Sequence, residues 1–426
     1  MTEDRPRVAL VDGCRTPFAR ARRELRSSSP LDLTLGVVKA LARRHDLKGS
    51  DIGTLRVGSA LAYPEFSFLA RETAIRLGWT TTEASSAEYA CGTGLRTAVD
   101  AVLELTSGDA EVGIAGGVES TSQMPLATNA AAREFVVGSM KAGPEQRRAM
   151  LDALTAADVL PPPPAFTEPY SGVSLAEYAE RLGGQWSVGR EEADAFTLQS
   201  HRRAAAARDA GRFAGSIVPV DGPGGTLDHD TVPDADLSAE RLAQARPLFP
   251  DLGGLVTAPS ASAVTDGAAA VLVATEEGCR RHDLRPLAWI RSWAFTSHDP
   301  QDGVLLGPAF ALPVALSRAG VNLADLGVID LHEAFAAQVL ANLRALDSTD
   351  FARRHLGRDE AVGAVDPAGI NLWGGSIALG HPFGATGGRL LTQLAHGMVA
   401  ADAELGATAM CVGGSRGVAV VLERAD

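Results

Sequence analysis

The chain has 426 residues, of which 46% are hydrophobic, and a formal net charge of −13 at neutral pH. This length exceeds one ordinary domain, so we expect two related lobes or one large α/β unit with a sizeable core. The negative charge argues against nucleic-acid binding, and we expect no membrane span because no apolar run reaches about eighteen residues.

The first 120 residues alternate strand-like and helix-like runs. RVALVDGCRTPF predicts a strand, and apolar residues at helical spacing predict an amphipathic helix over 32–45. LRVGSAL predicts a second strand, and FLARETAIRLG predicts a second helix that ends at Gly78.

Cys91 lies in a glycine turn, ACGTGL, at the predicted start of the next helix. Aligned peptide dipoles at a helix N-terminus favour an anion, so we expect an activated thiol with a stabilised thiolate. A cysteine that merely packs near a helix start is the alternative interpretation. EVGIAGGVES then predicts a strand with a glycine-rich end.

Residues 121–250 differ from the rest of the chain in composition and in the pattern of predicted elements. They contain few strand-like runs, an Arg/Ala-rich helix predicted over 191–210, and turn clusters such as DGPGGTLDHD. We interpret this region as an inserted loop domain that covers the active site, with most of its arginines on a solvated face. GGLVTAPSASAVTDGAAAVLVAT has the pattern of a core segment again. It predicts a turn rich in small residues and then a continuous apolar strand buried on both faces.

The C-terminal part carries three further reactive side chains. PLAWIRSWAF predicts a strand, PAFALPVALSRAG a helix, and LGVIDLHEAFAAQVLANL a strand that leads into a helix with His332 at the junction. GGSIALGHPFGATGG places His381 in a glycine-dense turn before a helix, and GATAMCVGGSRG places Cys411 at the end of a strand. GVAVVLE predicts the last strand.

One internal repeat organises these elements. The turn at Cys91, with its helix, its strand and a glycine pair, recurs later as GATG followed by a helix, a strand and another glycine pair. The repeat predicts duplicated βαβ lobes, formed by 1–120 with 251–275 and by 276–426. We expect the polar junctions of the two lobes to meet at one place.

The residues at these junctions suit one kind of chemistry. A thiol such as Cys91 beside an imidazole, from His332 or His381, is an acyl-transfer nucleophile with its base. A second thiol, Cys411, can move a proton to or from a substrate carbon or sulfur. The backbone N–H groups of Cys91 and Gly413 can stabilise oxyanions. Together they predict carbon–carbon bond making or breaking on thioesters.

In these motifs the chain resembles the thiolases. RTPF, the Cys91 turn, AGGVES, TAPSASAVTDGAAAV, HEAFA, GGSIALGHPFGATG and CVGGSRG occur in thiolase order over nearly the whole chain. HEAFAAQVLAN and SWAFTSHDPQDGVLLGPAF are most similar to the thiolase subunit of β-oxidation multienzyme complexes. The resemblance implies an α/β fold in which thiolase-like duplicated βαβ lobes pack as a layered α/β/α/β/α core with an inserted loop domain.

The resemblance also implies a role for each matching residue. Cys91 is the nucleophile that becomes acylated, and His381 activates it. Cys411 is the acid/base, protonating the departing acetyl-CoA carbanion in thiolysis. His332 and His381 form one oxyanion hole, and the N–H groups of Cys91 and Gly413 form the second.

Coenzyme A enters as a substrate and leaving group, not as a prosthetic group. Ser262, in SASAVTDG, matches a serine that contacts the pantetheine part of CoA. The resemblance implies no metal. It implies a homodimer or homotetramer, with an enoyl-CoA hydratase/3-hydroxyacyl-CoA dehydrogenase subunit as a further partner.

Two departures from the family pattern leave questions open. GGSRG stands where GGGxG is usual, which places Ser415 and Arg416 near the site. VSLAE, at 173–177, matches only loosely a family stretch that helps form the acyl pocket, so chain length and reaction direction stay open. A decarboxylating ketosynthase relative and a catalytically inactive lipid-binding relative are the alternatives, and Cys411 argues against the first.

Four cysteines, at 14, 91, 279 and 411, are far apart and show no metal-type CxxC spacing. Such usage suits a reducing compartment, and the polar start MTEDRPR lacks the apolar stretch of a secretory signal. We therefore expect a cytoplasmic protein, with Cys14 buried as a small apolar side chain.

Overall fold

The computed structural model describes residues 6–126, 128–160, 166–222 and 224–425. Its body contains one ten-stranded mixed sheet with the main order β10-β11-β12-β9-β1-β8-β5-β3-β4, and β2 pairs with β8 beside this path. The strands are β1 (Val8–Arg15), β2 (Ala19–Arg20), β3 (Thr54–Gly58), β4 (Glu83–Ser85), β5 (Val112–Glu119), β8 (Thr265–Thr275), β9 (Ala288–Ser297), β10 (Val328–Leu331), β11 (Leu405–Val412) and β12 (Arg416–Arg424). A separate hairpin joins β6 (Val220–Gly222) and β7 (Gly225–Leu227).

The two halves of the sheet repeat one topology. The order β1-β8-β5-β3 in one half corresponds to β9-β12-β11-β10 in the other. In each half the first strand is antiparallel to the second, and the second is antiparallel to the third. The fourth strand runs parallel to the third. A short antiparallel contact between β1 and β9 joins the halves. The duplication predicted from the internal repeat is therefore confirmed, although the sheet is mixed and not purely parallel.

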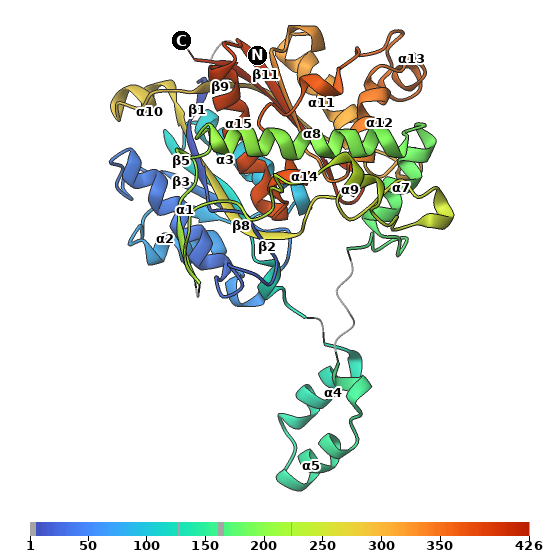
Figure 1. The fold of residues 1–426 in the computed structure, drawn as a ribbon. Coiled ribbons are helices and arrows are strands. Elements are labelled where there is room, and N and C mark those ends of the chain that lie inside the picture. Colours follow the sequence, from blue (N-terminus) through green and yellow to red (C-terminus); the bar gives the residue numbers. More distant parts are fainter. Residues whose placement is uncertain (1–5, 127, 161–165, 223, 426) are drawn as a thin grey trace.

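Helices form three further layers around the two half-sheets. Helices α3 (Thr93–Ser107) and α15 (Thr386–Ala400) pack against each other and against strands of both halves, so they form the central layer. Helices α1 (Pro30–Arg44) and α2 (Leu69–Arg76) cover the N-terminal half, and α11 (Gly307–Ala319) and α12 (Ala336–Leu346) cover the C-terminal half. The layered α/β/α/β/α architecture is the expected one (Figure 1).

Helix α1 shows how local sequence sets an element boundary. Ser29 caps the helix by accepting from the Asp32 N–H, and Asp32 accepts in return from the Ser29 N–H, so the capping box is complete. Pro30 occupies the first turn, where its missing N–H costs nothing. The helix therefore begins two residues before the predicted start.

The region between the halves has two parts. Helices α4 (Ala130–Ser139), α5 (Pro144–Asp152) and α6 (Ala156–Val159) form an arm that projects away from the body (Figure 1). Helices α7 (Leu175–Gln185) and α8 (Arg190–Asp209) pack instead on the C-terminal half, against α12 and α14 (Ser376–Leu379). The remaining helices are α9 (Ala239–Ala243), α10 (Glu276–Arg281) and α13 (Thr349–Phe351).

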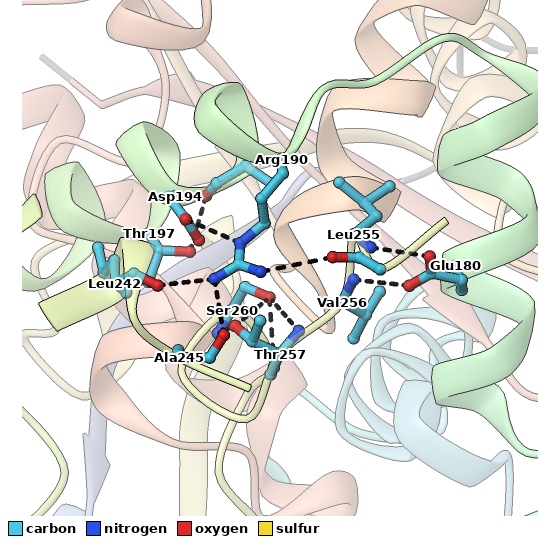
Figure 2. A network of polar contacts seen from close by, with 12 residues as sticks. Glu180, Arg190, Asp194, Thr197, Leu242, Ala245, Leu255, Val256, Thr257 and Ser260 are labelled. Carbon is cyan, nitrogen blue, oxygen red and sulfur yellow. Dashed lines mark hydrogen bonds and ion pairs between the residues drawn. The ribbon is translucent and has the colours of Figure 1, made fainter. Parts of the chain in front are cut away.

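A buried polar network fixes α7 and α8 to the segment before β8 (Figure 2). The Glu180 carboxylate on α7 accepts from the N–H groups of Leu255 and Val256 at 2.8 and 2.6 Å. Arg190 on α8 donates to the carbonyl oxygens of Leu242 and Ala245 at 2.6 and 3.1 Å. Residues 242–256, which precede β8, are thus held by charge-assisted hydrogen bonds from α7 and α8 and not by pairing in the sheet.

Candidate active site

The turn that carries Cys91 is backbone-strained and held by one threonine. Cys91 lies in the 3-10 turn Ala90–Gly92, which leads directly into α3. Ala90 has a φ of +43°, a left-handed conformation that costs a non-glycine residue about 1–3 kcal/mol. The Thr93 side chain accepts from the Tyr89 N–H at 2.9 Å and donates to the Ala90 carbonyl at 2.8 Å. These bonds fix the turn and so the direction of the cysteine.

An equivalent turn in the C-terminal half follows His381. The 3-10 turn Phe383–Ala385 leads into α15, and the His381 Nδ1 atom lies 2.7 Å from the Thr386 Oγ1 atom. This turn meets the end of β5 backbone to backbone. A Cβ added at Gly117, on β5, would lie 2.0 Å from the Gly384 carbonyl oxygen. Glycine is required there because nothing larger fits between the lobes.

Both turns open into one cavity of about 310 Å³. It brings together all six residues that the sequence singled out: Cys91, Ser262, His332, His381, Cys411 and Gly413. The rest of the lining is mainly apolar: Phe166, Ser174, Leu175, Ala176, Val264, Leu305, Ala334, Phe335 and Phe383. Residues of VSLAE thus lie in the wall of the pocket, although their match to the family pattern is loose.

The two imidazoles lie against each other and are neutral. The ring centroids of His332 and His381 are 4.2 Å apart. Burial and, secondarily, the Arg389 charge lower the pKa of His381 to about 3. Burial, His381 and Arg389 together hold the pKa of His332 well below its ordinary value. A neutral imidazole can accept a thiol proton, so His381 is suited to act as a base.

Both thiols are protonated in the resting site. Burial and, secondarily, the Glu119 carboxyl raise the pKa of Cys91 to about 12. The hydrogen bonds from the Gly413 and Cys91 N–H groups and the Arg416 charge act in the opposite direction. Burial, and secondarily Cys91, raise the pKa of Cys411 as well. The expectation of a stabilised thiolate at the helix N-terminus is therefore wrong for this state, because desolvation outweighs the favourable dipoles.

Glu119 is a site residue that the sequence argument missed. Its carboxylate accepts from the N–H groups of Ala60, Leu61 and Gly384 at 3.0, 3.2 and 3.2 Å, and from the Tyr63 hydroxyl at 2.9 Å. Burial raises its pKa to about 7, against these hydrogen bonds. It ties the N-terminal lobe to the turn after His381. The available signal was a single acid at the end of an apolar strand run, AGGVE.

Arg416, the unexplained residue of GGSRG, clamps the peptide next to Gly413. Its Nε atom donates to the Gly413 carbonyl at 2.8 Å, and its guanidinium lies 4.2 Å from the Tyr89 ring centroid. The N–H of the same peptide, from Gly414, donates to the buried Glu168 carboxylate at 2.8 Å. A cation and an anion thus hold the two ends of one peptide, which fixes the orientation of its neighbour, the Gly413 N–H.

In the described part of the chain, no three or more His, Cys, Asp or Glu side chains are grouped so that they could hold a metal ion. No helix in these same residues is long and apolar enough to cross a bilayer.

Comparison with known proteins places this geometry in a class. The family models described as thiolase, N-terminal domain, and thiolase, C-terminal domain, match residues 8–277 and 284–424. The fold and the family matches define an acyltransferase whose two halves share one topology. The chain belongs to the thiolase family.

Individual relatives agree over the full length. A 3-ketoacyl-CoA thiolase from Salmonella paratyphi B is 39% identical over 99% of this chain and 98% of its own, and one from Colwellia psychrerythraea is 37% identical over 98% and 97%. The crystal structure of human mitochondrial 3-ketoacyl-CoA thiolase is 29% identical with a TM-score of 0.83, covering 99% of both chains. Bacillus anthracis acetyl-CoA acetyltransferase is 27% identical with a TM-score of 0.84, also over 99% of both.

Proposed function

We propose that this chain catalyses the CoA-dependent thiolytic cleavage of 3-ketoacyl-CoA, reversible as the condensation of two acyl-CoA molecules, through an acyl-enzyme on Cys91. The observation that carries the proposal is the meeting of two thiols and two neutral imidazoles in one largely apolar pocket. The relatives named 3-ketoacyl-CoA thiolase, and a human structure of that name in complex with CoA, support this substrate.

In the first step, His381 takes the Cys91 proton as the sulfur attacks the keto carbon of the substrate. The negative charge that develops on the keto oxygen is stabilised by the N–H groups of Cys91 and Gly413. A base is required because the Cys91 thiol, with a pKa raised to about 12, does not ionise by itself near neutral pH.

In the second step, the bond between the α-carbon and the former keto carbon breaks. The electron pair leaves with the acetyl-CoA fragment, whose thioester oxygen accepts from His332 and from the newly protonated His381. Cys411 donates its proton to the α-carbon. After acetyl-CoA leaves, a CoA thiol gives its proton to Cys411 and attacks the Cys91 thioester. The shortened acyl-CoA is released, and the departing Cys91 sulfur takes back its proton from His381, which restores both thiols and the neutral imidazole.

The shape of the pocket supports a role for Ser262 and VSLAE in substrate binding. Ser262 lies in the lining, and its N–H donates to the Ala334 carbonyl at 2.9 Å, which fixes the segment beside the pocket. Leu175 and Ala176, with Phe166 and Phe383, supply apolar wall on which an acyl chain can pack.

The wider setting follows from the same resemblance. We place the activity in fatty-acid β-oxidation in the cytoplasm, with the chain acting as a homodimer or homotetramer and an enoyl-CoA hydratase/3-hydroxyacyl-CoA dehydrogenase subunit as a candidate partner. The HEAFA and SWAFTSHDPQDGVLLGPAF motifs support this subtype. Light scattering of the purified chain, and pull-down from its host, test the two assemblies.

The direct test is thiolysis of short, medium and long 3-ketoacyl-CoA by the purified protein, with intact-mass detection of the acyl-enzyme. We expect cleavage and an acyl adduct on Cys91. Acylation by malonyl-type substrates with decarboxylation but no thiolysis would instead support a ketosynthase relative. Absence of both reactions would support the inactive lipid-binding alternative.

A further inference from the structure

We propose that Arg389 and Ser376 hold His332 as a neutral imidazole with its proton on Nε2, so that an N–H donor faces the pocket. The inference deepens the proposed function, because it explains how one member of the oxyanion hole is kept in the donating form. Arg389 and Ser376 are positioning residues here, since they act through His332 and do not touch the substrate.

The three side chains form a chain of two short contacts in the protein interior. The Arg389 Nη2 atom lies 2.7 Å from the Ser376 Oγ atom. The same oxygen lies 2.9 Å from the His332 Nδ1 atom. His332 and Ser376 are 0% exposed and Arg389 is 2% exposed, so bulk water does not supply partners to this chain of bonds.

Counting protons assigns the tautomer. A guanidinium only donates, so the Ser376 oxygen accepts from Arg389. The serine hydroxyl has one proton, and its oxygen has no partner other than Arg389 and His332 among the described residues. If His332 donated from Nδ1, that hydroxyl proton would be buried without an acceptor, which costs about 1–3 kcal/mol. Donation from Ser376 to Nδ1 gives the hydroxyl proton an acceptor and leaves the ring proton on Nε2.

The Nε2 atom is where a ligand oxygen would bind. It is buried and has no hydrogen-bond partner within the described part of the chain. His332 nevertheless lines the cavity that contains both thiols. Because no described protein group accepts from this N–H, it is available to donate to a carbonyl or enolate oxygen of the substrate.

Surrounding charges keep Arg389 and Ser376 in place. Burial lowers the pKa of Arg389 to about 10, and the carboxyl groups of Asp330 and Glu333 oppose this, so the guanidinium stays charged near neutral pH. Glu333 also accepts from the N–H of Ile377 at 3.1 Å and from the Asn371 amide at 2.6 Å. These bonds fix the start of α14, which carries Ser376.

The neighbouring His381 differs from His332 in the surroundings of the hydroxyl group that its Nδ1 atom contacts. Its Nδ1 atom faces Thr386 Oγ1, and no guanidinium donates to that hydroxyl among the described residues. The contact of His381 therefore does not assign a tautomer, because the Thr386 hydroxyl can donate to Nδ1 or accept from Nδ1–H. The base role proposed for His381 uses the second form, in which Nε2 is unprotonated and takes the Cys91 proton.

The test reads the tautomer directly. In protein labelled with 15N-histidine, the shifts and two-bond couplings of the ring nitrogens distinguish the Nε2–H, Nδ1–H and imidazolium forms. His332 is assigned by the signals lost in H332Q. We expect the Nε2–H form in the wild type and a large Nδ1–H population in S376A. An Nδ1–H or imidazolium form in the wild type, or an unchanged tautomer in S376A, overturns the proposal.

Kinetics separate this inference from the proposed function. We expect S376A to lose kcat on the order of 10–100-fold with little change in KM, and S376T, which keeps the hydroxyl, to recover most of the loss. If S376T lost as much kcat as S376A while His332 kept its Nε2–H form, Ser376 would act only through packing. That result would contradict the proposed positioning role of its hydroxyl. Thermal unfolding checks that each variant is folded. The wild-type tautomer is measured without turnover, so failure of thiolysis in the wild type would refute the proposed function and leave the tautomer result standing.

Discussion

The imidazole rings of His332 and His381 lie with their centroids 4.2 Å apart and their planes tilted by 47°. They come from different segments, since His332 follows β10 and His381 precedes α15. Two imidazolium ions at this distance would repel each other in a buried site, so the contact requires at least one neutral ring. The arrangement therefore favours hydrogen-bond donation and proton transfer over fixed positive charge.

Replacing the nucleophile should abolish covalent chemistry. We expect C91A to form no acyl-enzyme with any 3-ketoacyl-CoA, because Cys411, the other thiol that lines the pocket, acts in the proposed mechanism on the α-carbon and not on the keto carbon. Intact mass after brief exposure to substrate measures the adduct. C279A, at a buried cysteine in the N-terminal core away from the pocket, is the matched control and should acylate normally. A persistent adduct in C91A would remove our nucleophile.

Replacing the second thiol should separate acylation from carbon–carbon chemistry. We expect C411A to become acylated by acyl-CoA but to lose thiolysis by about a hundredfold or more, the scale of a lost general acid/base. Acyl transfer and 3-ketoacyl-CoA cleavage are assayed on the same preparation. A near-normal thiolysis rate would contradict the acid/base role of Cys411.

The buried histidines should make the protein sensitive to acid. Folding lowers the pKa of His381 from 6.5 to about 3, so between these values the unfolded chain binds a proton that the folded chain does not. Stability is therefore complete above about pH 6.5 and is lost as the pH falls towards 3, by roughly 2–3 kcal/mol at two pH units below 6.5.

Chemical denaturation across this pH range measures the effect. The slope should be shallower in H381N than in the wild type, and unchanged in H229N, whose side chain is exposed. Equal slopes in the wild type and H381N would mean that His381 does not stay neutral when the protein folds.

Arg416 should control how easily Cys91 ionises. Its charge lowers the pKa of Cys91 against the dominant effect of burial, and its bond to Gly413 orients an N–H that stabilises the sulfur anion. We expect R416M to slow alkylation of Cys91 by iodoacetamide several-fold at a given pH, and to lower kcat more than it changes KM. R354M, at an exposed arginine, is the control. An unchanged alkylation rate in R416M would count against this coupling.

The contact between the lobes should not tolerate a methyl group. In G117A the added Cβ would lie 2.0 Å from the Gly384 carbonyl oxygen, and backbone cannot move aside as a side chain can. We expect a loss of about 1–3 kcal/mol or more, with reduced activity because the His381 turn shifts. G184A, in the last turn of α7 where a Cβ meets nothing within 4 Å, should be neutral or stabilising by up to about 1 kcal/mol. Similar unfolding free energies for the two variants would refute the close approach.

The sequence alone predicts many of the secondary-structure elements and the chemistry of the site. Hydrophobic period and glycine turns predict β1, α1, β5, β8 and α15 to within a few residues, because burial on one or both faces leaves a direct pattern in the sequence. The internal repeat predicts the duplicated halves, and the reactive residues at strand ends predict the chemistry. The division into 1–120 with 251–275, 121–250 and 276–426 stays a prediction.

Only the tertiary structure decided the electrostatics of the site. The dipole at the start of α3 is a local property and suggested a thiolate, whereas desolvation depends on everything packed around Cys91 and raises its pKa. Glu119, Glu168 and Arg389 escaped notice for the same reason. A charged residue in an apolar run gives no hint of its partners, which here come from segments more than ten residues away in the chain, and in two cases from more than two hundred. Chain neighbours set the elements, and contacts between distant segments set the protonation states.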